Sequence, residues 1–170
     1  PGERTVMNHY AASKAAAWQI CQMYGRTQGW PIVGAMRFQA YGPGQEEGNL
    51  VPAVLAAAKA GRDFPMTAGA QRRDWIYVDD VVQGLLAVAE ADLPTGSSVD
   101  LGSGRLTSVA DVVRMIYEEV DGAGRPLFGA LPSRPGEDQV QIADVQRSKE
   151  MIGWETAVTL EDGLRLTLDN

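Results

Sequence analysis

The stretch RRDWIYVDDVVQGLLAVAEA (residues 72–91) changes character part of the way along. Its first part is typical of a buried strand, and the part rich in alanine, valine and leucine is typical of a helix. We expect Asp79 or Asp80 to cap the start of that helix, because a carboxylate accepts from the free backbone N–H groups there. A strand that continues into a helix is characteristic of α/β proteins. The sequence therefore predicts an α/β fold around this unit.

The same alternation extends in both directions from this stretch. Gly42, Pro43 and Gly44 mark residues 39–48 as a loop. The region 125–140 reads mostly as loop, with one short strand. Strands are predicted at residues 31–38 and 97–101, a shorter strand at 63–69, and helices at 10–30, 49–61, 107–122, 143–154 and 159–170.

Composition excludes several classes of function. The 170 residues carry a net charge of −7, which argues against nucleic acid or an anionic membrane surface as a partner. No apolar run is long enough to span a membrane. A single cysteine, Cys21, fits a reducing cytoplasm. With one histidine and one cysteine, the chain lacks the usual zinc ligands, so no metal site is predicted.

Tyr10 and Lys14 are the first candidates for a site. Residues four apart on a helix lie on one face, so the ammonium would lie beside the phenol and lower its pKa. Such a phenol can exchange a proton with a sugar hydroxyl or ketone while a nicotinamide exchanges hydride. The alternative is that Tyr10 packs and Lys14 is solvated, and the spacing alone leaves both readings open.

Several motifs follow one another in a fixed order along the chain. They are Y-x-x-x-K (10–14), Y-G-P (41–43), N-L-x-P (49–52), R-D-W-x-Y-V-D-D (73–80), R-P-G (134–136) and D-x-x-x-x-K-x-x-x-G-W (144–154). This ordered set resembles the extended short-chain dehydrogenases/reductases, and within them the NAD-dependent nucleotide-sugar epimerases and dehydratases. The resemblance implies part of a Rossmann-type parallel sheet plus a smaller α/β substrate-binding domain. Residues 1–43 and 77–102 would belong to the former, and 44–76 and 103–170 to the latter.

The resemblance also implies roles around the cofactor, NAD or NADP. Tyr10 would be the catalytic acid/base, Lys14 would bind the nicotinamide ribose, and Phe38 would contact the cofactor. In the family, a glycine-rich phosphate loop and a catalytic Ser or Thr precede the tyrosine. We therefore expect this chain to be the C-terminal half of a protein about twice as long. The complete protein is expected to be a homodimer in the cytoplasm.

Two arginines are implied to bind the diphosphate of a nucleotide sugar, Arg73 and Arg134, because a guanidinium matches phosphate oxygens. A surface salt bridge, such as one between Arg73 and Asp74, is the alternative. Asn49 matches a position that contacts the diphosphate, and simple capping of a helix explains it as well.

Further positions are assigned to the substrate by the same resemblance. Pro65 and Met66 match a segment along the nucleotide base, although core packing also accounts for Met66. Gln39 replaces an asparagine that often contacts substrate. Glu137 follows R-P-G where Asp is frequent. Arg72 is a second candidate for the phosphate.

The stretch GSGRLT (102–107) imitates a dinucleotide-binding fingerprint, because it follows a strand and opens a helix. It lacks the third glycine, and we interpret it as a structural turn.

The resemblance thus predicts an NAD(P)-dependent epimerase or 4,6-dehydratase acting on a nucleotide-diphosphate sugar. The alternatives are a nucleotide-sugar 4-ketoreductase and a non-catalytic module that binds a nucleotide sugar. The residues that would separate these reactions are expected upstream of Pro1, and the fragment alone is expected to be inactive.

Overall fold

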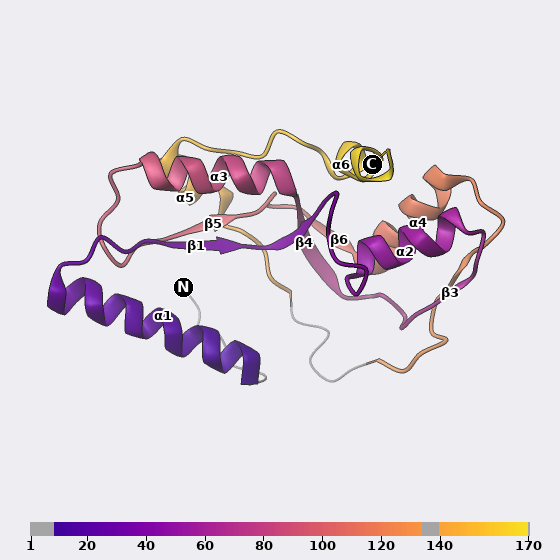
Figure 1. The fold of residues 1–170 in the computed structure, drawn as a ribbon, viewed down its shortest axis with the longest axis horizontal. Coiled ribbons are helices and arrows are strands. Elements are labelled where there is room, and N and C mark those ends of the chain that lie inside the picture. The colour runs from indigo at the N-terminus through magenta and orange to yellow at the C-terminus, as the bar shows by residue number, and fades with distance from the viewer. Residues whose placement is uncertain (1–8, 134–139, 170) are drawn as a thin grey trace.

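A computed structural model describes residues 9–133 and 140–169 of the chain. It confirms the predicted α/β class (Figure 1). The helices are α1 (His9–Gln28), α2 (Leu50–Lys59), α3 (Val78–Glu90), α4 (Val109–Val120), α5 (Val145–Ile152) and α6 (Leu160–Leu168). The strands are β1 (Gly34–Arg37), β2 (Gln39–Tyr41), β3 (Phe64–Pro65), β4 (Arg72–Tyr77), β5 (Ser98–Leu101), β6 (Leu106–Ser108) and β7 (Pro126–Leu127).

Three differences from the predicted elements stand out. Residues 39–41 form strand β2, although the glycine- and proline-rich run suggested a loop from residue 39 onward. Strand β6 was not predicted, because its three residues carry no periodic pattern. The N-cap of α3 is Tyr77, so the prediction of Asp79 or Asp80 at that position is wrong. Both aspartates lie within the first turn of α3, where their charge favours the helix dipole.

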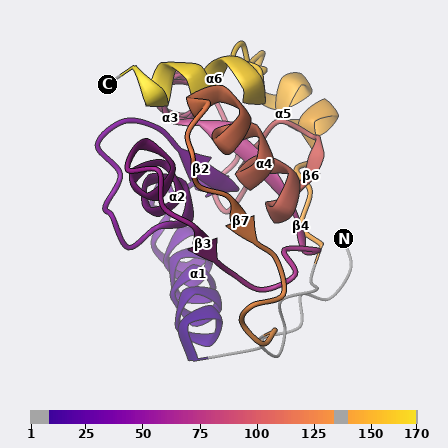
Figure 2. The same ribbon diagram turned by 90° about the vertical axis from the view of Figure 1, so that its right-hand side faces the viewer.

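The strands of the described part of the chain form three small sheets. β1 pairs with β5 in parallel, and β3 pairs with β7 in parallel, as Figure 2 shows for the second pair. β4 is the centre of the third sheet, with β2 parallel on one side and β6 antiparallel on the other. A bridge between Arg73 and Gln141 adds a further contact to β4.

Strand β4 separates two hydrophobic clusters. Its side chains alternate between the two faces of the sheet. Ile76 belongs to the cluster with Val99 and Leu101 of β5, and Trp154 closes that cluster. Trp75 and Tyr77 belong to the larger cluster, which is built mainly from α2 and α4. Helix α5, which the domain prediction assigns to the smaller domain, packs against β5. The domain boundaries therefore stay a prediction.

Helices α3 and α1 flank the β1–β5 pair on opposite sides (Figure 1). Helix α1 approaches β1 where Gly34 leaves room, since a Cβ at this position would lie 2.9 Å from the indole of Trp18. Gln22 of α1 donates to the carbonyl of Gly96. Gly25 is the one residue of α1 that is buried, so most of this helix is open to solvent.

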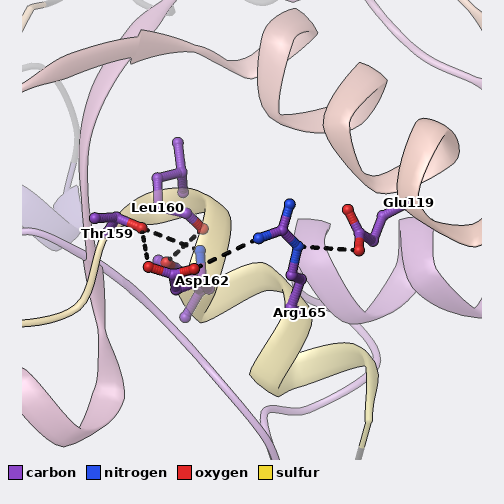
Figure 3. A network of polar contacts seen from close by, with 6 residues as sticks. Glu119, Thr159, Leu160, Asp162 and Arg165 are labelled. Carbon is purple, nitrogen blue, oxygen red and sulfur yellow. Dashed lines mark hydrogen bonds and ion pairs between the residues drawn. The ribbon is translucent and has the colours of Figure 1, made fainter.

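The C-terminal helix is tied to α4 by a polar network (Figure 3). Thr159 caps α6 by accepting from the backbone N–H of Asp162 at 3.1 Å. Arg165 donates to Glu119 of α4 at 3.1 Å and lies 3.5 Å from Asp162. These groups are exposed, so their ion pairs contribute little to the stability of the fold.

Candidate active site

Tyr10 and Lys14 lie together on one face of α1. The Nζ of Lys14 is 5.5 Å from the centroid of the Tyr10 ring. The side chain of Tyr10 is 70% exposed, and Lys14 is exposed as well. Both residues belong to the first turns of α1, at the end of the helix nearer to β4 in Figure 1. The structure thus presents an open phenol and an ammonium close enough to act on one ligand.

The other tyrosines of the chain are less suited to proton transfer. Burial raises the pKa of Tyr41, and the charge of Asp80 raises it further. Burial likewise raises the pKa of Tyr77 and of Tyr117. These three phenols stay protonated at neutral pH and lie in the core. Tyr24, on α1, stacks on Trp30 with ring centroids 4.8 Å apart.

Phe38 and Gln39 lie where β1 passes into β2. The backbone N–H of Phe38 donates to the carbonyl of Leu101 at 3.0 Å, so its position is tied to the end of β5. Gln39 is exposed and lies opposite Trp75 in the parallel register of β2 and β4. The carboxyl ends of parallel strands are where α/β proteins bind ligands. The predicted contacts of Phe38 with the cofactor and of Gln39 with the substrate stay predictions.

Asn49 is the N-cap residue of α2, but its side chain makes no capping hydrogen bond. Its Nδ2 donates to the carbonyl of Glu46 at 3.2 Å. The amide is exposed and leaves the first N–H groups of α2 without a side-chain cap, which is an arrangement that favours an anion.

Pro65 and Met66 differ in what they offer a ligand. Pro65 is exposed at the end of β3, whereas the side chain of Met66 is 5% exposed and belongs to the larger core cluster. The carbonyl of Met66 accepts from the N–H of Leu131 at 3.0 Å. Core packing accounts for the side chain of Met66, and Pro65 is the more accessible of the two.

Arg73 is half-buried in β4, next to the exposed Arg72. One Nη of Arg73 donates to the carbonyl of Arg72 at 2.9 Å, and Arg72 donates to the carbonyl of Leu106 at 3.1 Å. Among the predicted substrate residues, Arg134 and Glu137 lie outside the described residues. Their predicted contacts therefore stay predictions.

The residues 102–104 form a structural turn, as interpreted from the sequence. The backbone N–H groups of Ser103 and Gly104 donate to the carboxylate of Asp74 at 2.7 and 3.0 Å. A phosphate loop needs such N–H groups free for its ligand, and here an internal carboxylate occupies them. The interpretation of GSGRLT as a decoy is confirmed.

Two buried aspartates that bind distant segments of the backbone were not identified from the sequence. Asp74 is 1% exposed and Asp80 is 4% exposed. Asp80 accepts from the backbone N–H groups of Ala157 and Val158, each at 3.0 Å. Charged groups are rarely buried without partners, so acidic residues inside the apolar run 72–91 were the available signal. Their partners lie far away in sequence and could not be identified from it.

A pocket of about 390 Å³ lies elsewhere, between the 102–107 turn, the first part of α5 and the segment before α6. Lys149 and Glu155 form an ion pair of 2.8 Å at this pocket. Of the predicted site residues that the structure describes, none lines it. The pocket is therefore distinct from the Tyr10–Lys14 face.

Within residues 9–133 and 140–169, no group of three His, Cys, Asp or Glu side chains is arranged to hold a metal ion. In the same part of the chain, no helix has both the length and the apolar character needed to cross a membrane.

Known proteins resemble this chain in sequence and in fold. It is 31% identical over 169 residues to a dTDP-glucose 4,6-dehydratase of Xanthomonas campestris, covering 94% of this chain and 48% of that protein. It superposes with a TM-score of 0.89 on a UDP-glucose 4-epimerase of Thermotoga maritima solved with UDP-glucose, at 27% identity, covering 97% of this chain and 53% of that one. The enzyme WbmF of Bordetella bronchiseptica, solved with NADH, gives a TM-score of 0.82 at 28% identity, covering 99% and 55%.

The chain spans about half the length of the curated relatives it matches. The family described as the NAD dependent epimerase/dehydratase family matches residues 2–102, which is more than half of the chain. This match includes the Tyr10–Lys14 pair, Arg73 and Asp74. The chain therefore belongs to the NAD-dependent epimerase/dehydratase family.

Proposed function

We propose that the protein containing this chain is an NAD(P)-dependent enzyme that epimerises or dehydrates a nucleotide-diphosphate sugar. The observation that carries the proposal is the Tyr10–Lys14 pair, with 5.5 Å between the ammonium and the ring centroid. Tyr10 exchanges a proton with the reacting sugar hydroxyl or ketone. Lys14 lies beside the phenol and binds the nicotinamide ribose. A location in the cytoplasm is part of the proposal, supported by the single cysteine.

The described residues fit one end of the cofactor. An exposed ammonium and phenol on one helix face supply the donors that a ribose hydroxyl and a carbonyl require. The N–H groups of the 102–104 turn are bound to Asp74, so this turn does not supply the pyrophosphate site. Tyr10 and Lys14 would hold the nicotinamide end of the cofactor, which would supply reversible hydride exchange with the sugar.

The proposed substrate lies against β4 and the start of α2. Arg73 and Arg134 bind the diphosphate. Asn49 contacts it at the start of α2, where the first backbone N–H groups of the helix favour an anion. Pro65, the more accessible residue of the predicted Pro65–Met66 segment, contacts the base, while Gln39 and Glu137 contact the sugar nucleotide. Support comes from the relatives, since the proteins matched in sequence act on dTDP-glucose and a structural neighbour holds UDP-glucose.

The remaining part of the same protein is the proposed partner of α1, α3 and β1. Several large apolar side chains of α1 and α3 are exposed, namely Ile20, Met23, Tyr24, Val82, Leu85 and Leu86. Among the described strands, β5 is the one that pairs with β1, so the second edge of β1 is open. Such an edge and such faces call for a covering layer. The complete protein is proposed to be a homodimer.

The replacement Tyr10→Phe in the full-length protein tests the proposal. Loss of the phenolic proton is expected to reduce turnover of the UDP- or dTDP-sugar by about a thousandfold. Binding of the sugar nucleotide is expected to stay within about twofold, because the ring remains. Steady-state kinetics and calorimetry measure the two quantities.

The matched control is Tyr24→Phe, which removes an exposed phenol from the same helix. Its turnover is expected to equal that of the wild type. Parallel losses of binding and turnover in Tyr10→Phe would assign Tyr10 a structural role. Tight binding of the sugar nucleotide by a wild-type protein that never turns it over would favour the binding module.

A further inference from the structure

Asp74 makes an unusually complete set of contacts for a buried carboxylate. Its side chain is 1% exposed. Oδ1 accepts from the backbone N–H and from the hydroxyl of Ser103, both at 2.7 Å. Oδ2 accepts from the backbone N–H groups of Gly104 and Ala143, both at 3.0 Å. Two separate segments of the chain are therefore bound to one side chain of β4.

Those two segments lie on either side of the neighbouring residue, Arg73. The 103–104 turn leads into β6, where Thr107 is the register partner of Arg73. Ala143 follows shortly after Gln141, which forms a bridge with Arg73 on the other side. Asp74 thus binds the two backbone segments that lie on either side of Arg73.

The contact also requires close approach of the turn. A Cβ on Gly102 would lie 2.8 Å from Oδ2 of Asp74 and 2.6 Å from the Cβ of Ala143. Since β4 alternates, the buried Asp74 and the more exposed Arg73 project to opposite faces. The carboxylate can therefore control the backbone at Arg73 without touching a ligand of Arg73.

We propose that Asp74 is a positioning residue for Arg73: by holding the 103–104 turn and residue 143 against β4, it sets the position from which Arg73 binds the diphosphate. This inference rests on the proposed function of Arg73. A displacement of a binding group by an ångström is enough to weaken its contact strongly.

The chain offers a matched control in Asp80. It is also buried and also accepts two backbone N–H groups at 3.0 Å. Its partners, Ala157 and Val158, precede α6 and do not border Arg73. In either Asp→Asn variant, an NH₂ donor replaces one acceptor oxygen and faces backbone N–H donors. The two variants differ in which segment they release. Because Asp74 accepts four hydrogen bonds and Asp80 two, the free energy of unfolding of each variant is measured beside its binding.

The experiment measures the dissociation constants of UDP and dTDP by calorimetry with the full-length protein. Asp74→Asn is expected to weaken binding about tenfold, and Asp80→Asn to leave it unchanged. In an Arg73→Ala background, Asp74→Asn is expected to have no further effect, because the two residues act through one contact. Ser103→Ala removes the hydrogen bond that the hydroxyl donates to Asp74 and the one that it accepts from the backbone N–H of Arg105. It is expected to weaken binding about threefold with the fold intact.

Each result decides the matter. Unchanged binding in a folded Asp74→Asn variant overturns the inference, and so does an equal loss in the Arg73→Ala background. Equal losses in Asp74→Asn and Asp80→Asn reduce the effect to general destabilisation. If Asp74→Asn does not fold, unchanged binding in Ser103→Ala overturns the inference. A wild-type protein that binds neither UDP nor dTDP refutes the proposed function itself, and the inference with it.

Discussion

At the scale of single residues, burial separates the tyrosines into two groups. Tyr41, Tyr77 and Tyr117 have raised pKa values because the core disfavours their phenolates. Tyr41 donates to the carbonyl of Leu160 at 3.2 Å, and its ring packs edge-on against Trp75. Tyr10 is exposed beside an ammonium. The same side chain therefore serves packing at three positions and is available for chemistry at another.

The raised pKa of Tyr41 predicts a dependence of stability on pH. The folded state holds this proton more tightly than the unfolded chain, in which the pKa is 10.0. The resulting stability is complete below pH 10 and is lost as the pH rises toward the folded-state value. Above pH 10, the wild type is expected to lose about 1.4 kcal/mol per pH unit more than Tyr41→Phe.

The free energy of unfolding, measured by urea titration between pH 8 and 11, checks this expectation. At pH 8, Tyr41→Phe is expected to be less stable by about 1 kcal/mol, because one hydrogen bond is lost. The control is Tyr24→Phe, which leaves the buried phenols in place. Identical slopes for Tyr41→Phe and the wild type above pH 10 would refute the account of Tyr41.

At the scale of elements, helix ends depend on their capping residues. Ser108 is the N-cap of α4, and its hydroxyl oxygen accepts from the backbone N–H of Asp111 at 3.1 Å. The helix packs its buried face, including Val112, Val113 and Ile116, into the larger cluster. The cap therefore supports an element that carries much of the core.

The replacement Ser108→Ala is expected to destabilise α4 by about 1 kcal/mol, because one backbone N–H loses its acceptor. Amide hydrogen exchange of α4 in the full-length protein measures the effect. Ser108→Thr keeps the hydroxyl and serves as the control, with exchange close to that of the wild type. Equal protection in the alanine and threonine variants would mean that the cap contributes nothing.

Strands β2 and β6 could not be predicted from local sequence patterns, whereas the helices could. The helices have periodic apolar faces or strong helix formers, and their bounds lie close to the predicted ones. β2 and β6 are each three residues long, too short for a pattern. Both exist because β4 offers hydrogen-bonding edges on its two sides.

At the scale of the whole molecule, the two helices that flank β1 and β5 leave apolar surface uncovered (Figure 1). In α3, Val82, Leu85 and Leu86 lie at helical spacing on one exposed face. In α1, nearly every side chain is at least partly open to solvent. Exposed large apolar side chains gathered on one face of a helix are typical of an interaction surface.

We therefore predict that residues 1–170, expressed alone, self-associate and bind a hydrophobic dye. The cause is the uncovered surface of α1 and α3 together with the open edge of β1. Analytical ultracentrifugation and dye fluorescence measure both effects. The same chain within the full-length protein is the control, and it is expected to bind little dye. A monodisperse monomer that unfolds cooperatively would contradict the prediction.

The sequence by itself determined the α/β class, the six helices that the described residues form, and the likeness to nucleotide-sugar epimerases and dehydratases. It also placed Tyr10 and Lys14 on one helix face. These depend on periodicity and on spacings of a few residues, which the backbone converts directly into geometry. Only the tertiary structure decided the partners of Asp74 and Asp80, because the bonds to Ala143 and Val158 join residues 69 and 78 positions apart. No local pattern encodes such a distance, since it is the packing of the whole chain that brings the two groups together.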